Sequence, residues 1–342
     1  MQGLEFRVLI VALACLTAAC SRDGARSANG AEASTPPDDD AAIITQDMLR
    51  QHISVIADDS MRGRATPSRE LDETAAYIAA HFERLGLRPL GSDGSFIQHY
   101  PLPTERTSRA PNVVGLVEGS DPALRREYLI LSAHMDHVGV GAPVNGDSIY
   151  NGADDNASGT AAVMALAEAF ARAKERPRRS IIFLTVSGEE RGLWGSAYFA
   201  SHPPVPVDSI VAALNIDMVG RNWRDTIVAI GKEHSDLGAS VERVAAAHSE
   251  LHLHPIDDPW PNEQFYFRSD HYNFARRGVP VLFFFSGTHA DYHGPDDEVN
   301  KIDFEKEMRV ARLLYYFGME VANGGQRPAW NPESRRRIVG QQ

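Results

Sequence analysis

Five short segments rich in aspartate, glutamate and histidine follow one another along this chain. Three of them come directly after apolar runs of the kind that form buried strands. In chain order the segments are Ala133–His137 (AHMDH), Gly152–Gly159 (GADDNASG), Ser187–Ser196 (SGEERGLWGS), Asn215–Gly220 (NIDMVG) and Asp291–Glu298 (DYHGPDDE). Imidazole and carboxylate groups are common protein ligands of divalent metals, so the pattern predicts a metal centre.

His134 lies at the carboxyl end of the apolar run 127–133. In open α/β sheets, ligands bind outside the carboxyl ends of the strands. A single histidine at such a place is more often a packed, hydrogen-bonded residue than a metal ligand. Asp136 favours the ligand, because its carboxylate can accept the second ring N–H of His134 and fix the tautomer of the imidazole.

Two pairs of adjacent acidic residues occupy the next two segments. Asp154 and Asp155 precede a helical stretch at 157–174, and a helix N-cap would account for one of them. Asp155 could turn its two oxygens toward two different ions. Glu189 and Glu190 would ordinarily be a solvated surface pair, but they lie between a strand end and a glycine-rich turn. One of them can therefore bind a metal while the other faces the substrate.

The acidic side chains also require positive charge nearby. Asp217 closes the apolar run 211–216, and a charged residue there is costly unless it is paired or bound to a cation. If one cleft held the carboxylates of the segments, five would meet there: Asp136, Asp155, Glu189, Glu190 and Asp217. Such a cluster is strongly unfavourable without counter-charge, and two divalent ions supply it. Imidazole and carboxylate without thiolate fit zinc, with cobalt or manganese as alternatives.

These segments resemble those of the co-catalytic zinc exopeptidases of peptidase family 28 type, which include secreted bacterial aminopeptidases, glutamate carboxypeptidase II and the transferrin receptor. The resemblance covers roughly residues 45–322. It implies two Zn²⁺ per chain and a cis peptide between Asp155 and Asn156. The first ion would be held by His134, Asp155 and Asp217, and the second by Asp155, Glu190 and His293.

The resemblance also implies how the remaining residues act. Glu189 would be the general base and Tyr292 a donor to the oxyanion, while Arg268 and Asp270 would lie near the substrate. The implied activity is that of an aminopeptidase, in which a metal-bridged hydroxide attacks the N-terminal peptide bond of a peptide.

Three other functions fit the same scaffold. A carboxypeptidase could use the same two-metal chemistry, with Arg268 pairing with a free carboxylate. A glutaminyl cyclase uses one zinc ion and makes no net hydrolysis. A non-catalytic binding protein, like the transferrin receptor, would lose ligands or the base, whereas this chain keeps all of them.

The order of elements predicts a single three-layer α/β sandwich with a mostly parallel central sheet. The four apolar runs at 127–133, 180–186, 211–216 and 279–285 alternate with helical stretches at 157–174, 236–249 and 303–322. Residues 45–87 are expected to form two helices. The second would cover the sheet with an apolar face made of Ala75, Ile78, Ala79 and Phe82.

One catalytic domain is expected at 43–323, followed by an unstructured tail at 324–342. Many proteins of the family carry an inserted protease-associated domain, but Pro101–Asn112 is too short to hold one.

Composition limits the partners. The net charge is −12, and no basic patch is large enough to indicate a nucleic acid, so a peptide substrate is the expected partner. The two cysteines, Cys15 and Cys20, both lie near the N-terminus, so the mature chain would need no disulfide. The sequence indicates neither the oligomeric state nor the preferred terminal residue.

The N-terminus predicts export. Leu9–Ala19 is an apolar run of signal-peptide length, too short for a comfortable membrane span. Leu16–Cys20 resembles a bacterial lipobox, so residues 1–20 are interpreted as a signal peptide with Cys20 as the lipidated residue. The polar stretch 21–42 would then be a disordered tether to a membrane, with the enzyme periplasmic and anchored at the outer membrane. The alternative is ordinary signal cleavage close to the same position and a secreted enzyme.

Overall fold

The computed structural model describes residues 39–105 and 107–340. The predicted signal peptide and the lipidation of Cys20 lie outside the described residues, as does most of the predicted tether. The end of the tether is predicted at Ala42, and that boundary is wrong. Asp40–Ile43 form a short 3-10 helix in which Ala41 is fully buried, and the Asp39 carboxylate accepts from the N–H of Ala41. Residues 39–42 therefore belong to the folded domain.

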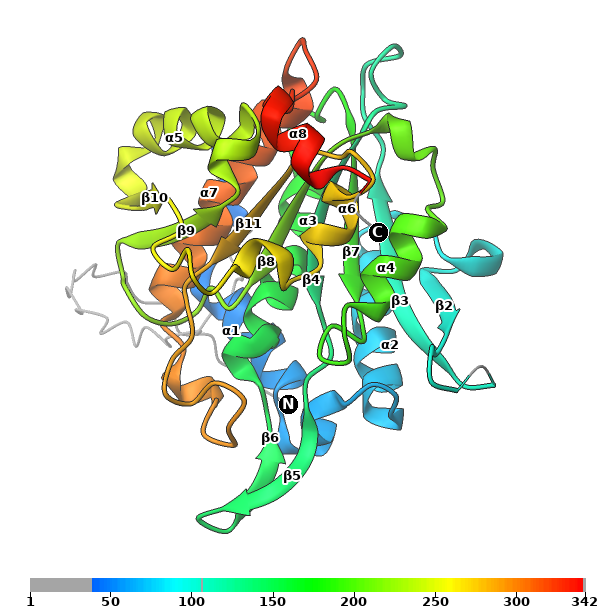
Figure 1. The fold of residues 1–342 in the computed structure, drawn as a ribbon, viewed down its shortest axis with the longest axis vertical. Helices are drawn as coiled ribbons and strands as arrows, with labels where there is room; N and C mark the ends of the chain where they lie inside the picture. The colour runs from blue at the N-terminus through cyan, green and yellow to red at the C-terminus, as the bar shows by residue number, and fades with distance from the viewer. Residues whose placement is uncertain (1–38, 106, 341–342) are drawn as a thin grey trace, which may run out of the picture. The chain divides into compact units, whose positions relative to one another are not determined.

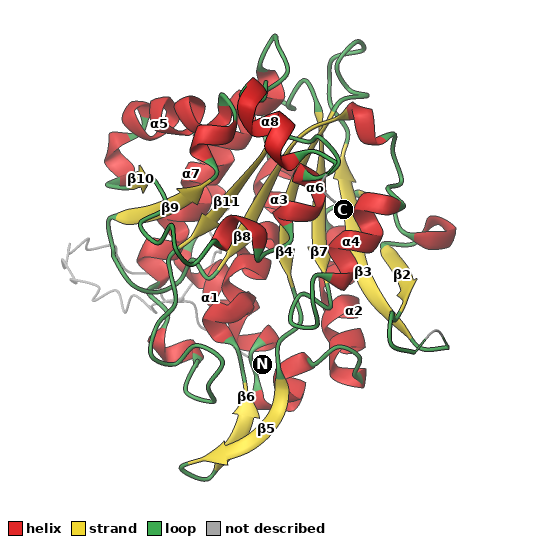
Figure 2. Cartoon of the chain, in the orientation of Figure 1, coloured by secondary structure: helices red, strands yellow, loops and turns green. Residues whose placement is uncertain are grey.

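A nine-stranded sheet runs through the described part of the chain (Figures 1 and 2). Its four central strands are parallel and lie in the order β7 (Ser180–Val186), β4 (Tyr128–His134), β8 (Ile210–Asp217) and β11 (Val281–Phe285). All of their residues except Tyr128 are buried, as expected for parallel strands covered on both faces. They coincide with the four apolar runs of the sequence, so the predicted α/β fold is confirmed.

The flanks of the sheet are mostly antiparallel. On one side β3 (Arg109–Val117) pairs with β7 and carries β1 (Arg88–Pro89) and β2 (Ile97–Pro101). On the other side β9 (Thr226–Ile230) runs antiparallel to β11, and β10 (His254–Ile256) runs parallel to β9. The sheet is therefore mixed, and its parallel part is the centre. The sequence analysis missed these flanking strands, because proline, asparagine and glycine interrupt β3 and the others are short.

Helices cover both faces of the sheet, which gives the three layers. One hydrophobic cluster joins the first face to α1 (Gln46–Ile56), α2 (Arg69–Arg84), α3 (Gly159–Arg172), α5 (Leu237–Ala247) and α7 (Phe304–Asn323). A second cluster joins the opposite face to α4 (Trp194–Ser201), α6 (His271–Ala275) and α8 (Pro332–Ile338). Successive residues of β4 alternate between the clusters, with Leu129 and Leu131 in the first and Ile130 in the second.

The five helices on the first face are those that the sequence predicts. Three of them begin at a capping side chain, since Thr45, Ser68 and Asp303 each accept from the N–H three residues on. The predicted apolar face of α2 is confirmed, because Ala75, Ile78 and Phe82 are buried in the first cluster and Ala79 packs against it.

The prediction of an unstructured tail after residue 323 is wrong up to residue 340. Asn331 caps α8 by accepting from the N–H groups of Glu333 and Ser334. The Trp330 indole donates to the carbonyl of Gly278 at 2.8 Å, and Ile338 is fully buried in the second cluster. The charged composition of this segment gave no indication of these two anchors or of the start of a helix.

A separate two-stranded hairpin, β5 (Gly139–Val144) and β6 (Asp147–Tyr150), projects from the domain at the foot of Figure 1. It connects the first two acidic segments of the sequence. Among the described residues, no helix has the length and apolar character needed to span a membrane.

Candidate metal centre

The carboxyl ends of the central strands bring the candidate residues together. His134 is the last residue of β4 and Asp217 the last of its neighbour β8. Glu189 and Glu190 follow β7, which lies on the other side of β4. Asp155 enters from the turn that leads into α3. Parallel strands end at a common edge, so residues that lie far apart in the sequence meet there.

His134, Asp155 and Asp217 form the first ligand set. Nε2 of His134 lies 3.3 Å from Oδ1 of Asp155 and 3.3 Å from Oδ1 of Asp217, and all three side chains are buried. Nδ1 of His134 lies 3.1 Å from the carbonyl oxygen of Asp136. A carbonyl can only accept, so Nδ1 carries hydrogen and Nε2 is the atom free to bind a metal. The hydroxyl of Ser269 donates to the other oxygen of Asp217 at 3.0 Å.

The second oxygen of Asp155 faces a second ligand set. Oδ2 of Asp155 lies 3.1 Å from Nε2 of His293, which also lies 3.1 Å from Oε2 of Glu190. His293 comes from the loop after β11 and has a φ of 54°. The peptide between Asp155 and Asn156 is cis, as the resemblance implies. A carboxylate whose two oxygens face two groups of ligands has the arrangement of a bridge.

His137, which was assigned no role from the sequence, lies against the carboxylates of the second set. Its Nδ1 lies 2.9 Å from Oε1 of Glu190 and 3.7 Å from Oδ2 of Asp155. The side chain is buried, and neither ring nitrogen has a hydrogen-bond partner of acceptable geometry. His137 could have been predicted as a candidate ligand because it is a second histidine in the segment Ala133–His137, three residues after the end of the strand.

Asp136 supports the centre differently from the prediction. Its carboxylate lies 3.8 Å from Nδ1 of His134, too far for a hydrogen bond, and its backbone carbonyl takes that N–H instead. The prediction that the carboxylate accepts from His134 is therefore wrong. It accepts from the hydroxyl of Thr66 at 2.8 Å and from the N–H of Glu189 at 3.3 Å. Asp136 thus holds the turn that carries Glu189.

A buried arginine, also missed from the sequence, ties the ligand loops together. Arg64 is fully buried and donates to the carbonyl oxygens of Met135 at 2.8 Å, Gly152 at 2.7 Å and Asn151. Met135 follows His134, and Gly152 opens the turn of Asp155. One guanidinium therefore connects both parts of the first ligand set.

Asp297 has a similar function on the other side of that turn. Its carboxylate accepts from the N–H of Asp154 at 3.1 Å and from the N–H of Asp155 at 3.0 Å. Asp297 and Arg64 both bind backbone atoms. Such contacts do not depend on the side chain of the partner residue, so they cannot be predicted from the residue types.

The negative charge of the carboxylates in the centre is only partly balanced by positive groups of the protein. Burial would lower the pKa of His134, but Asp217 and Asp155 raise it well above its usual range. Burial raises the pKa of Glu189 well above its usual range, and although His134 opposes this, nearby carboxylates such as Asp270 reinforce it. Buried carboxylates that force protons onto their neighbours would be relieved by bound cations.

The donor geometry fits two divalent ions. The closest N–O distances within the two sets run from 2.9 to 3.7 Å. A tetrahedral zinc site with bonds of about 2.0–2.1 Å has donors about 3.3 Å apart. The donors of His134, Asp155 and Asp217 lie within 4.8 Å of one another, as do those of His137, Asp155 and Glu190, so Asp155 belongs to both groups. Imidazole and carboxylate donors without a thiolate are compatible with zinc.

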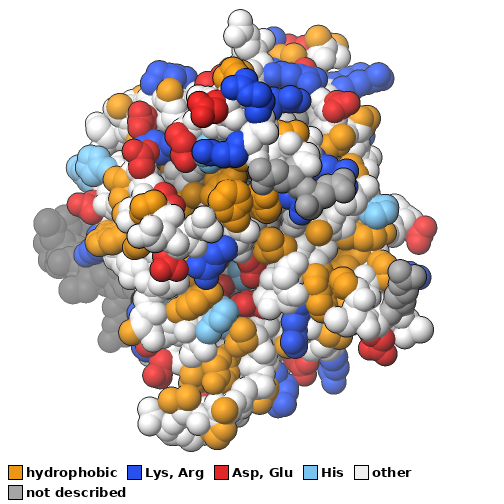
Figure 3. Space-filling view, in the orientation of Figure 1, with side chains coloured by type: hydrophobic (Ala, Val, Ile, Leu, Met, Phe, Trp, Pro, Cys, Tyr) orange, Lys and Arg blue, Asp and Glu red, His pale blue; other side chains and the backbone are white. Residues whose placement is uncertain are grey.

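A small cavity opens beside the first ligand set. Its lining consists of His134, Asp155, Glu189, Asp217, Met218, Phe265, Arg268, Ser269, Phe283, Phe285, Thr288 and Tyr292. In Figure 3, acidic and histidine side chains are visible near the middle of the face shown, between hydrophobic patches. The predicted base and the predicted oxyanion donor both face this cavity. Burial raises the pKa of Tyr292, and Asp155 raises it further, so the phenol remains a neutral donor.

The two predicted substrate neighbours differ in position. Arg268 lines the cavity, where it is 48% exposed, pairs with Glu263 at 3.3 Å and lies over the ring of Phe265. Asp270 is fully buried and does not line the cavity. Its predicted place against a substrate is therefore not supported, although burial raises its pKa to about 7.

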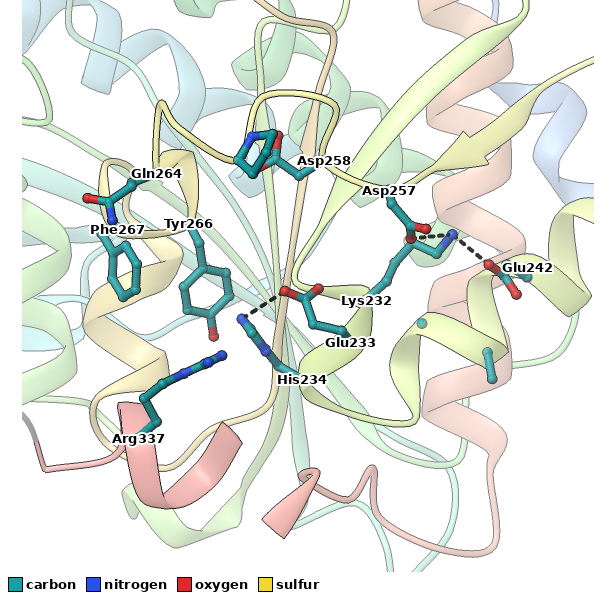
Figure 4. A pocket seen from close by; sticks show the side chains of 13 residues that line it. Lys232, Glu233, His234, Glu242, Asp257, Asp258, Gln264, Tyr266, Phe267 and Arg337 are labelled. Carbon is teal, nitrogen blue, oxygen red and sulfur yellow. Dashed lines mark ion pairs between the residues drawn. The ribbon is translucent and has the colours of Figure 1, made fainter. Parts of the chain in front are cut away.

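A larger cavity, of about 730 Å³, is lined by residues that include Gln264, Tyr266 and Phe267 (Figure 4). Its charged groups largely satisfy one another, since Lys232 pairs with Glu242 and Asp257, and His234 with Glu233. Among the described residues, neither group of metal-binding side chains lies in it.

Comparison with known proteins identifies the family. A family model described as Peptidase family M28 matches residues 112–318. A Leptosphaeria maculans protein named "Probable zinc metalloprotease" is 36% identical over 155 residues, which cover 44% of this chain and 34% of that protein. Leupeptin-inactivating enzyme 1 of Streptomyces exfoliatus is 27% identical over 263 residues, covering 77% of this chain and 52% of that protein. The chain thus spans about a third to a half of the length of these relatives.

Solved structures share the fold. The LapA aminopeptidase of Legionella pneumophila superposes with a TM-score of 0.65 at 20% identity, covering 84% of this chain and 74% of that one. An aminopeptidase from Aneurinibacillus sp. strain AM-1 gives 0.65 at 15% identity, covering 85% and 97%. A glutaminyl cyclase of Porphyromonas gingivalis gives 0.62 at 16% identity, covering 81% and 99%. At such identities the likeness shows the fold and leaves the reaction open.

Proposed function

The chain belongs to peptidase family M28, and on that premise we propose that it is a zinc-dependent aminopeptidase with two zinc ions at the centre described above. Its substrates would be peptides with a free N-terminus. The observation that carries the proposal is the position of Asp155, whose Oδ1 lies 3.3 Å from His134 and whose Oδ2 lies 3.1 Å from His293. A carboxylate whose two oxygens face two sets of ligands suits a centre of two ions.

The protein groups around the cavity suit peptide hydrolysis. Zinc ions bound here would supply Lewis acidity toward the scissile carbonyl and toward an attacking water. Glu189 lines the cavity but belongs to neither ligand set. A carboxylate in this position can take a proton from water and pass it to the leaving amine. Tyr292 would donate its O–H to the oxyanion.

The charge of the cavity favours the amino end of a peptide. Asp155 and Asp217 would bind zinc, which leaves Glu189 as the carboxylate of the lining outside the ligand sets, so the case for the amino end rests mainly on the cations of the lining. The lining contains one permanently cationic side chain, Arg268, which is half exposed and already paired with Glu263. A carboxypeptidase would need a cation committed to the terminal carboxylate of its substrate.

The opposite wall of the cavity is apolar. Met218, Phe265, Phe283 and Phe285 line it, and Phe283 and Phe285 are buried almost completely. Burying an apolar side chain against such a wall contributes about 1.5–3 kcal/mol. We therefore expect a preference for apolar N-terminal residues.

The deciding experiment compares three substrates with matched sequences: an aminoacyl arylamide such as the leucine derivative, an N-acetylated peptide with a free carboxylate, and a peptide with N-terminal glutamine. The proposal predicts rapid hydrolysis of the first and no reaction of the blocked peptide, with the activity lost with a chelator and restored by zinc. Release of the C-terminal residue from the blocked peptide would indicate a carboxypeptidase. Cyclisation of the third without hydrolysis would indicate a glutaminyl cyclase.

We also propose export with lipid attachment at Cys20, which rests on the apolar run and the lipobox of the sequence alone. A single acyl chain holds a protein only marginally, so stable anchoring needs several chains. Mass spectrometry of the mature N-terminus tests this. An unmodified N-terminus downstream of Cys20, in a soluble fraction, would indicate a secreted enzyme instead.

A further inference from the structure

We infer that His137 is a fourth protein ligand of the second zinc ion, which would then be held by Asp155, Glu190, His293 and His137. The inference rests on the two-zinc centre proposed above. It adds a third imidazole to a centre for which the sequence implied two.

The position of His137 is that of a ligand. Its Nδ1 lies 2.9 Å from Oε1 of Glu190 and 3.7 Å from Oδ2 of Asp155. These distances bracket the donor spacing of about 3.3 Å in a tetrahedral zinc site. His293 meets the same two carboxylates at 3.1 Å from the other side, with its ring centroid 5.6 Å from that of His137. Two imidazoles thus flank one pair of carboxylates.

The lack of other partners argues against a packing role. His137 is 1% exposed, and neither of its ring nitrogens makes a hydrogen bond of acceptable geometry. Buried polar groups in folded proteins nearly always have a hydrogen-bond partner or a bound ion. A buried imidazole without a partner among the protein atoms therefore indicates a partner that is not part of the protein. The ring is also fixed in place. A Cβ added to Gly152 would lie 2.5 Å from Cγ of His137, so the backbone of the bridging turn packs directly against the imidazole.

The main alternative is that His137 donates a hydrogen bond to Glu190 and so only orients it. The distance of 2.9 Å allows this as well, so the two roles have to be separated by experiment. The two roles need different chemistry from the same nitrogen. A ligand offers a lone pair, whereas an orienting residue offers an N–H.

A fourth protein ligand on the second ion would give the two ions different roles. Zinc sites closed by four protein ligands are typically structural, and sites with three keep a position open for water or substrate. The first set has three protein ligands, and all three line the substrate cavity. Glu190, His293 and His137 do not line it. The first ion would therefore contact the substrate, and the second ion would mainly have a structural role.

Zinc titration of the metal-free protein tests the inference, with His137→Ala as the variant and His81→Ala as the matched control. His81 is another buried histidine, whose Nε2 meets the carbonyl of Met164 away from the centre. The wild type is expected to bind two ions. His137→Ala should weaken one of them by more than the roughly 10–100-fold that loss of a supporting residue costs. The control should bind both ions as the wild type does.

Chemical rescue distinguishes a ligand from a hydrogen-bond donor. Free imidazole, which has a lone pair, should restore the second ion to His137→Ala. Pyrrole has the same shape and an N–H but no available lone pair, and it should restore nothing. Equal rescue by both molecules, or a variant that binds two ions with unchanged affinity, would overturn the inference.

A second measurement covers the case in which the variant fails to fold. X-ray absorption of the zinc-loaded wild type counts imidazole ligands directly, and three for two ions are expected. A count of two in a protein that binds two ions and hydrolyses aminoacyl arylamides would sink the inference and leave the proposed function standing. A wild type that binds fewer than two ions, or is inactive, would instead refute the proposed function.

Discussion

The two ligand sets of the centre are built in different ways. In the first, His134 and Asp217 are the last residues of two adjacent central strands, and both are buried. Each is also fixed by a hydrogen bond behind it, from His134 to the carbonyl of Asp136 and from Ser269 to Asp217. In the second, Glu190 and His293 come from loops, and the His293 side chain is 38% exposed. Oε1 of Glu190 has no hydrogen-bond partner.

The difference shows what each part of the fold contributes. Backbone pairing in the sheet fixes the strand ends that carry His134 and Asp217. The loops of the second set can adjust, and an ion would hold them in place as much as they hold the ion. Asp155 belongs to both sets, and its turn is fixed from two sides by Arg64 and Asp297.

The largest effect is expected at the residue that the two sets share. Asp155→Ala should abolish binding of both zinc ions and reduce hydrolysis to background, because each oxygen of this carboxylate faces a different set. Metal analysis after gel filtration checks it, with circular dichroism as the control for folding. Retention of one full equivalent of zinc would mean that Asp155 serves one set only.

The adjacent glutamates should separate base from ligand. Glu189→Gln should keep both ions and lose about 10²–10⁴-fold in kcat, which is what a general base contributes. Glu190→Gln should lose zinc from the loop-borne set, because Glu190 lies between His137 and His293. The two variants should be measured for zinc content and rate side by side. Similar zinc content and similar rates in both would show that the roles are assigned wrongly.

Sequence reasoning succeeded where a side chain is placed by the strand before it. His134, Asp217 and Glu190 follow apolar runs, so their meeting at one edge of the sheet was predictable. It failed where the partner is a backbone atom or a residue distant in sequence. Arg64 holds three carbonyl oxygens, and nothing in its neighbourhood predicts them.

The errors have the same physical origin. The carboxylate of Asp136 could be assigned to His134 by spacing alone, but the turn directs it to Thr66 and Glu189. Residues 324–340 look like a polar tail, yet Trp330 and Ile338 fasten them to the second core cluster. Composition predicts the average behaviour of a segment and misses one or two apolar anchors.

Loss of the Asp136 carboxylate should have an intermediate effect. Asp136→Ala removes the acceptor for the N–H of Glu189, so we expect a loss of about 10–100-fold in kcat with both ions retained. Thr66→Val, which removes a donor to the same carboxylate, should shift kcat in the same direction by less. Loss of zinc from the Asp136 variant, with the base still in place, would return Asp136 to the role predicted from the sequence.

The smallest effect is expected at Arg268, and that small effect is informative. Arg268 is the one permanently cationic side chain in the lining, but it already pairs with Glu263 at 3.3 Å in an exposed position. Exposed pairs contribute about 0–1 kcal/mol, so Arg268→Met should change kcat/KM for a leucine arylamide by less than about 10-fold. Glu263→Gln is the matched variant and should also have little effect. If the guanidinium instead holds the carboxylate of a substrate, its loss would raise KM for peptides with a free C-terminus far more than for arylamides, which have none. That pattern would move the proposal from the amino end of the peptide to the carboxyl end, while the difference between the strand-borne and loop-borne ligand sets would remain.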